Sequence, residues 1–121
     1  MDAGSQPQPV LDASTVAQLR QAQVDYGNPQ FIGQLVGIYK KNAPGRVAEI
    51  GQAIAARDAT RLAHVAHTLK SNCSMLGALR MAAVCNTLED KGDAADFDGA
   101  AALLSDLETE LPRVLAALDE F

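Results

Sequence analysis

Residues 58–78 read DATRLAHVAHTLKSNCSMLGA. Apolar side chains recur in this stretch at spacings of 4, 3, 4 and 3 residues: Leu62, Ala66, Leu69, Cys73 and Leu76. This periodicity is typical of a helix that buries one face. Asp58 is expected to cap the N-terminus of the helix, and Gly77 lies near its expected end. The stretch therefore predicts a helix of about five turns that packs against other helices.

The same helical pattern extends outward from this stretch through nearly the whole chain. Further helices are expected from Asp12 or Ser14 to Gly27, from Asn28-Pro29 to Pro44-Gly45, over Val47, Ile50 and Ile54, from Met81 to Gly92, and from Phe97 onward. Pro44-Gly45 is expected to interrupt or kink its helix, whereas Pro112 is expected to kink the last helix without ending it. In that last helix Leu104, Leu107, Leu111, Val114 and Leu118 follow a spacing of 3 and 4, typical of helices packed at a small angle.

These helices predict an all-α fold, an antiparallel four-helix bundle with an additional short N-terminal helix. No stretch alternates with period two, so no sheet is expected. Residues 1–9, which read MDAGSQPQP, are small, polar and proline-rich and are expected to form a disordered tail or linker. A single domain is expected over residues 10–121.

The amino-acid composition argues against some classes of partner. The chain has 121 residues and a formal net charge of −5, and no basic cluster, which argues against nucleic acid and anionic membranes as partners. Cys73 and Cys85 both fall on apolar stripes and are expected to be buried free thiols, as in a reducing compartment. The chain offers neither a signal peptide nor a membrane span. We expect a soluble, cytoplasmic, monomeric domain.

His67 lies about 140° around the helix from the centre of the apolar stripe, so it should face solvent. The residues one turn on, Ser71 and Ser74, are small and leave the imidazole accessible to a partner. Lys70 lies one turn along and is expected to supply a cation near the ring, as an exposed, solvated point charge. A neutral imidazole is a nucleophile at neutral pH. No carboxylate is expected within a turn of the ring; the nearest in the sequence are Asp58 and Glu89.

Two other interpretations of these residues remain. A surface histidine on a helix is usually a solvated residue without a function. In that case the domain is a helical docking module that does not use His67 for chemistry. His64 and His67, three residues apart, are also compatible with a metal site, but they lack an acidic or cysteine ligand nearby. No metal or cofactor is therefore predicted.

Residues 66–78, AHTLKSNCSMLGA, resemble the phosphorylation motif of histidine-containing phosphotransfer (HPt) domains, which runs roughly His-x-Leu-Lys-Gly-Ser-Ser and then Leu-Gly-Ala. The matching residues are His67, Leu69, Lys70, Leu76, Gly77 and Ala78. The similarity covers nearly all of residues 10–118 and includes Asp58-Ala59 and Cys85-x-x-Leu88-Glu89. Two departures are visible, Ser71 where the family commonly has Gly and Asn72 where it often has Ser or Ala, and both keep the surface low.

The resemblance implies that His67 accepts a phosphoryl group and that Lys70 supports it electrostatically. His64, Ser71, Ser74 and Ala78 would then surround the ring where a partner docks. The implied partners are receiver domains that carry a phosphorylatable aspartate in a bacterial multistep phosphorelay. The domain would carry phosphate without kinase or phosphatase activity of its own. The linker-like start suggests the C-terminal module of a hybrid sensor kinase, with a free-standing protein as the alternative.

Overall fold

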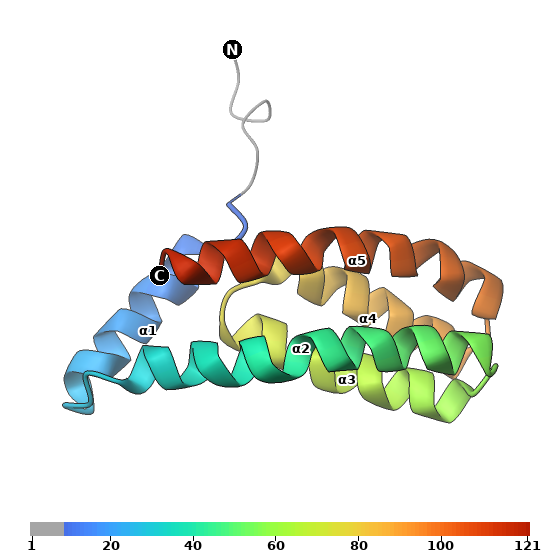
Figure 1. Ribbon diagram of the computed structural model, residues 1–121, viewed down its shortest axis with the longest axis horizontal. Coiled ribbons are helices and arrows are strands. Elements are labelled where there is room, and N and C mark those ends of the chain that lie inside the picture. The colour runs from blue at the N-terminus through green and yellow to red at the C-terminus, as the bar shows by residue number, and fades with distance from the viewer. Residues whose placement is uncertain (1–8) are drawn as a thin grey trace, which may run out of the picture.

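The computed structural model describes residues 9–121, which form five α-helices (Figure 1). In chain order they are α1 (Ala13–Asp25), α2 (Phe31–Ala55), α3 (Ala59–Met75), α4 (Leu79–Asp93) and α5 (Phe97–Asp119). No strand occurs in this part of the chain, and none of its helices is long and apolar enough to cross a membrane. The all-α prediction is confirmed. Apart from Pro9, the tail expected over residues 1–9 lies outside the described residues.

Helices α2 to α5 form the bundle, and α1 crosses the end at which α2 begins and α5 finishes (Figure 1). Helix α1 has no fully buried residue, but Leu19 packs partly buried against the core. Hydrogen bonds also hold the start of the helix. Asp12 caps it by accepting a hydrogen bond from the Thr15 amide, and the Asp12 amide donates to the Gly77 carbonyl at 2.7 Å. The start of α1 is thereby fixed to the turn that joins α3 and α4.

Helix α2 is continuous through Pro44, so the predicted interruption at Pro44-Gly45 is wrong, and the stretch over Val47, Ile50 and Ile54 belongs to the same helix. Proline removes a single backbone donor, and here both Pro44 and Gly45 lie on the exposed face. The flanking Ala43 and Val47 are buried and keep the helix packed against the bundle. Pro112 also lies inside a continuous helix, as predicted.

The predicted stripe of α3 forms the centre of the core. Leu62, Ala66, Leu69 and Cys73 are fully buried, and Leu76 is 1% exposed. The large residues that are also fully buried, or nearly so, come from the three other bundle helices: Ile50, Met81, Cys85, Leu88, Leu107 and Val114. Burying each leucine contributes about 1.5–3 kcal/mol. Val65 is also buried, and the remaining side chains of α3 outside this stripe are partly or fully exposed.

Helices α3 and α4 approach each other closely at Gly92. A Cβ atom on Gly92 would lie 2.7 Å from the backbone nitrogen of Ala63 and 3.0 Å from its Cα. The sequence suggested that Gly92 ends its helix, but α4 continues to Asp93 and Gly92 is buried within it. Gly92 is therefore a packing residue, and its missing side chain sets the distance between α3 and α4.

Replacing Gly92 with alanine tests this close approach. Alanine normally stabilises an exposed helix interior by about 0.5–1 kcal/mol relative to glycine. We expect the opposite for Gly92→Ala, a loss of about 1–3 kcal/mol, because the new methyl group meets backbone atoms that cannot move aside. The measurement is the free energy of unfolding in denaturant.

Gly45→Ala is the matched control, because a Cβ on Gly45 meets nothing within 4 Å. This variant should be as stable as the parent or more stable. Equal stability of the Gly92→Ala protein and the parent would contradict the packing argument.

Candidate functional site

His67 lies in the middle of α3, and its side chain is 59% exposed. Its neighbours Ala66 and Leu69 are fully buried, so the backbone that carries the imidazole is anchored in the core. The prediction that His67 faces solvent is confirmed. A partner can therefore reach the ring without a rearrangement of the bundle.

Glu89 on α4 contacts the imidazole directly. The His67 Nδ1 atom lies 3.0 Å from Glu89 Oε2. The expectation that no carboxylate lies near the ring is therefore wrong. Gly92 follows Glu89 by three residues and Ala63 precedes His67 by four, so the close approach of these two helices is what brings the carboxylate to the ring. The sequence marked Glu89 only as part of the family match and Gly92 only as a possible helix end, so neither pointed to this contact.

Lys70 binds the other oxygen of the same carboxylate. Its Nζ lies 2.6 Å from Glu89 Oε1 and 3.3 Å from Asn86 Oδ1. The side chain is only 27% exposed, so Lys70 is held in place, where the sequence suggested a freely solvated cation. The Glu89 carboxylate thus bridges the imidazole and the ammonium group.

The protonation state of Glu89 determines which nitrogen of His67 carries the proton. The pKa of Glu89 is lowered, first by the hydrogen bond from Lys70, with smaller contributions from His67, while partial burial opposes the shift. Glu89 is therefore ionised at neutral pH, and an ionised carboxylate accepts hydrogen bonds but donates none. Nδ1 of His67 must then carry the proton, which leaves Nε2 as the nitrogen with a free lone pair in the neutral ring.

The polar residues around His67 form a low surface. His64, Ser71 and Ser74 are all exposed. The Ser71 hydroxyl donates to the His67 carbonyl at 3.2 Å, so its short side chain folds back onto α3 and leaves the ring clear. These positions agree with the surroundings expected from the sequence.

Ala78 does not belong to this surface. It is fully buried, and its amide donates to the Cys73 carbonyl at 2.9 Å as α4 begins. The helical periodicity that placed Ala78 near His67 ends with α3 at Met75, and Gly77 turns the chain with a φ of 81°. The expectation that Ala78 contacts a partner is therefore corrected.

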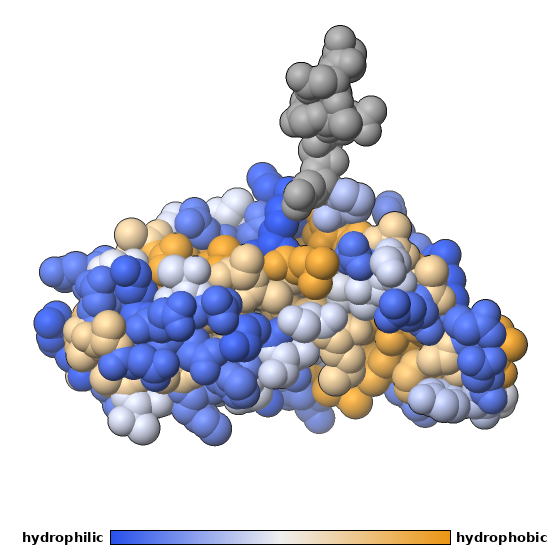
Figure 2. Space-filling view, turned by 180° about the vertical axis from the view of Figure 1, so that it is seen from behind, coloured by the Kyte–Doolittle hydropathy of each residue, from blue (hydrophilic) through white to orange (hydrophobic). Residues whose placement is uncertain are grey.

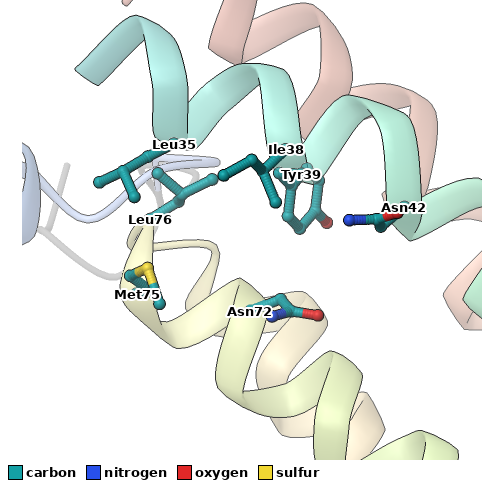
Figure 3. A pocket seen from close by; sticks show the side chains of 7 residues that line it. All are labelled: Leu35, Ile38, Tyr39, Asn42, Asn72, Met75 and Leu76. Atoms are coloured by element: carbon teal, nitrogen blue, oxygen red, sulfur yellow. The ribbon is translucent and has the colours of Figure 1, made fainter. Parts of the chain in front are cut away.

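An apolar hollow of about 120 Å³ lies beside this surface, between α2 and α3. The side chains that line it are Leu35, Ile38, Tyr39, Asn42, Asn72, Met75 and Leu76 (Figure 3). Ile38 is 58% exposed and Met75 is 51% exposed. Figure 2 shows further hydrophobic patches on an otherwise hydrophilic face, the larger ones in the half that contains α1.

Metal ligands do not gather at the two histidines. Within residues 9–121, no three His, Cys, Asp or Glu side chains are arranged so that they could hold a metal ion. The groups that the structure does bring together at His67 are the imidazole, the Glu89 carboxylate and the Lys70 ammonium group.

The fold and the site together define a helical bundle that presents one oriented, nucleophilic histidine on its surface. The family model described as "Hpt domain" matches residues 34–120. The chain belongs to the Hpt domain family.

Individual relatives agree with this assignment. The multistep phosphorelay regulator 1 of Schizosaccharomyces pombe is 28% identical over 101 residues, which are 84% of this chain and 34% of that protein. The chain thus spans about a third of the length of this relative. The crystal structure of histidine-containing phosphotransfer protein B from Pseudomonas aeruginosa superposes with a TM-score of 0.83 at 26% identity, over 94% of this chain and 95% of that one.

A histidine-containing phosphotransfer protein from maize superposes with a TM-score of 0.78 over 92% of this chain and 86% of that one. At 19% identity this likeness supports the fold alone. The helical bundle is thus shared by a bacterial and a plant protein.

The tautomer of His67 should depend on Glu89. In the parent, ¹⁵N chemical shifts of the neutral ring should report a protonated Nδ1 and an unprotonated Nε2. Glu89→Ala removes the acceptor, so the ring should become a mixture of both tautomers. Asp90→Ala is the matched control, because Asp90 is an exposed carboxylate on the same helix. An unchanged tautomer in the Glu89→Ala protein would show that the hydrogen bond does not orient the ring.

Proposed function

We propose that this domain is a phosphocarrier of a multistep phosphorelay, in which His67 accepts a phosphoryl group from a receiver-domain aspartate and passes it to another receiver. The observation that supports this proposal is the exposed imidazole whose Nδ1 is held by Glu89, within a fold of the Hpt domain family. The relative named as a phosphorelay regulator supports the same pathway class.

The proposed step needs no general base. The Nε2 lone pair attacks the phosphorus of the aspartyl phosphate, a nitrogen–phosphorus bond forms, and the bond from phosphorus to the aspartate oxygen breaks. The aspartate leaves as a carboxylate, and the ring gains positive charge while Nδ1 keeps its proton. The ionised Glu89, 3.0 Å from Nδ1, stabilises that charge. Transfer onward to the next receiver is the same reaction in reverse.

Lys70 offsets an otherwise unfavourable charge. A carboxylate beside the nucleophile orients the ring but also repels the incoming phosphoryl group. The Lys70 ammonium, 2.6 Å from Glu89 Oε1, offsets this repulsion. We assign Lys70 an electrostatic role and no role as nucleophile or base.

The remaining catalytic parts are assigned to the partners. Phosphoryl transfer depends on positioning and on charges around the transferred group, and this site supplies a nucleophile and one neutralising cation. We therefore propose a carrier without kinase or phosphatase activity of its own, acting on receiver domains. Its two buried, free thiols support a reducing compartment such as the cytoplasm.

The receiver is proposed to cover the low surface of α3 around His67. His64, Ser71 and Ser74 are the polar members of that surface, and the neighbouring hollow with Ile38 and Met75 extends it with apolar area.

Replacing His67 with glutamine should abolish phosphoryl transfer, because no other residue supplies the nucleophile. The assay incubates the protein with a receiver carrying labelled phosphate and follows the label. His64→Gln is the control and should retain the label on His67. Thermal stability of the His67→Gln protein should stay close to that of the parent because the ring is mostly exposed.

Label retained by a folded His67→Gln protein would indicate that another residue is the phosphoryl acceptor. If no receiver labels the parent protein, the domain would instead be the docking module that is not phosphorylated.

Replacing Lys70 should have a modest effect on transfer. Partly exposed ion pairs contribute about 0–1 kcal/mol, which corresponds to less than roughly a tenfold change in rate. Lys70→Ala should slow transfer within this range, and more at low salt than at high salt. Lys70→Arg should retain most of the rate. A folded Lys70→Ala protein as inactive as His67→Gln would give Lys70 a larger role.

A long side chain at position 71 should hinder docking. Ser71→Gln places a bulky group one turn from His67 and should slow transfer without lowering the free energy of unfolding. Ser105→Gln, at an exposed position on α5, serves as the control and should transfer at the parental rate. Equal transfer rates in the two variants would indicate that the receiver approaches over a different surface.

A further inference from the structure

Asn86 on α4 is a second hydrogen-bond acceptor for Lys70. Its Oδ1 accepts from Lys70 Nζ at 3.3 Å, and the same ammonium group donates to Glu89 Oε1 at 2.6 Å. Asn86 precedes Glu89 by three residues, so the two acceptors are neighbours on one face of α4. Lys70, which belongs to α3, is therefore held by two side chains of the helix opposite its own.

This double contact encloses Lys70 more than the other paired lysines. The side chain of Lys70 is 27% exposed, whereas Lys40 and Lys91, each paired with an aspartate, are 38% and 36% exposed. A lysine has a long, flexible stem, and a single exposed ion pair holds such a side chain weakly. The second acceptor therefore restricts the ammonium group to the side of α3 that faces α4.

The second acceptor is neutral, which matters for a site that receives a phosphoryl group. The ionised Glu89 carries one negative charge and Lys70 one positive charge, so together with the uncharged amide of Asn86 they sum to zero beside the ring. The position of Lys70 also affects Glu89, because the hydrogen bond from Lys70 is the main cause of the lowered pKa of that carboxyl group. Glu89 in turn holds Nδ1 of His67 at 3.0 Å.

We propose that Asn86 is a positioning residue for phosphoryl transfer at His67. As a neutral acceptor it holds the Lys70 ammonium against Glu89 without adding a negative charge to the site. Asn86 acts through Lys70, and its effect on transfer rests on the proposed phosphocarrier function. The side chain at this position therefore sets both the mobility of the cation and the net charge that an incoming phosphoryl group meets.

The hold on Lys70 is tested without any phosphoryl transfer, by ¹⁵N relaxation of the Lys70 ammonium group. Asn86→Ala should make the ammonium more mobile than in the parent, whereas Asn86→Asp keeps an acceptor and should not. Alanine is the better helix former, so greater mobility in Asn86→Ala cannot come from a weakened helix. Thr87→Ala is the control, because the exposed Thr87 hydroxyl donates to the Ala83 carbonyl of its own helix. Equal mobility in the parent and Asn86→Ala would overturn the proposal.

The role of the neutral side chain is tested by transfer from a phosphorylated receiver at low and high salt. Asn86→Ala should slow transfer by about two- to fivefold, as expected for the loss of one exposed hydrogen bond. Asn86→Asp should slow transfer further, because it adds a negative charge, and the difference between the two variants should shrink as salt is added. A merely structural role of Asn86 predicts no such dependence on salt.

Thr87→Asp is the control for charge, because it places the same carboxylate at an exposed position on α4, and it should slow transfer less than Asn86→Asp. If Asn86→Asp transfers as fast as the parent at low salt, the charge argument is overturned. If the parent accepts no phosphoryl group from any receiver, the phosphocarrier function fails, while the relaxation of Lys70 still decides whether Asn86 holds the ammonium. If the parent transfers and both Asn86 variants match its rate, the carrier function stands and the positioning role is refuted.

Discussion

The contact of α3 and α4 at Gly92 and Ala63 is the constraint on which the functional site depends. Glu89 and His67 lie on different helices about one turn from this contact, and their hydrogen bond of 3.0 Å depends on how closely the two helices pack. A glycine provides this closeness because a Cβ in its place would lie 2.7 Å from a backbone nitrogen. The packing of one small residue thereby determines the orientation of the imidazole.

The carboxylate at the site has two opposing effects. It holds the proton on Nδ1 of His67 and stabilises positive charge on the ring, but its own charge disfavours a phosphoryl group nearby. The hydrogen bond from Lys70 keeps the Glu89 carboxylate ionised by lowering its pKa. The Lys70 ammonium, 2.6 Å away, also offsets the negative charge of the carboxylate. Both interactions remain partly exposed to water, so each contributes little to stability. Their importance lies in setting the reactive nitrogen.

The features that could be predicted from the sequence are those that follow from the periodicity of a single helix. The stripe from Leu62 to Leu76 placed the buried face of α3 correctly, and with it the exposure of His67, because both follow from the 3.6-residue period within a single helix. Ala78 lies beyond the end of that helix, where the period no longer applies, and its predicted exposure was wrong. At Pro44, packing of the flanking residues outweighed a local helix-breaking signal.

Contacts between helices could not be read in this way. Glu89 is separated from His67 by 22 residues, and its position depends on the register of α4 against α3, which no periodicity within either helix specifies. The hydrogen bond from Lys70 to Glu89 could not be predicted for the same reason. Gly92 carried the information, but a glycine near the end of an apolar stretch is equally compatible with a helix terminus.

The central claim is that Glu89 reserves Nε2 of His67 for the phosphoryl group. The most direct test is to phosphorylate ¹⁵N-labelled protein with a receiver domain and to record the phosphorus–nitrogen coupling by nuclear magnetic resonance. The account predicts one phosphoryl group, coupled to Nε2 of His67. A phosphoryl group on Nδ1 of His67, or on His64, would contradict it.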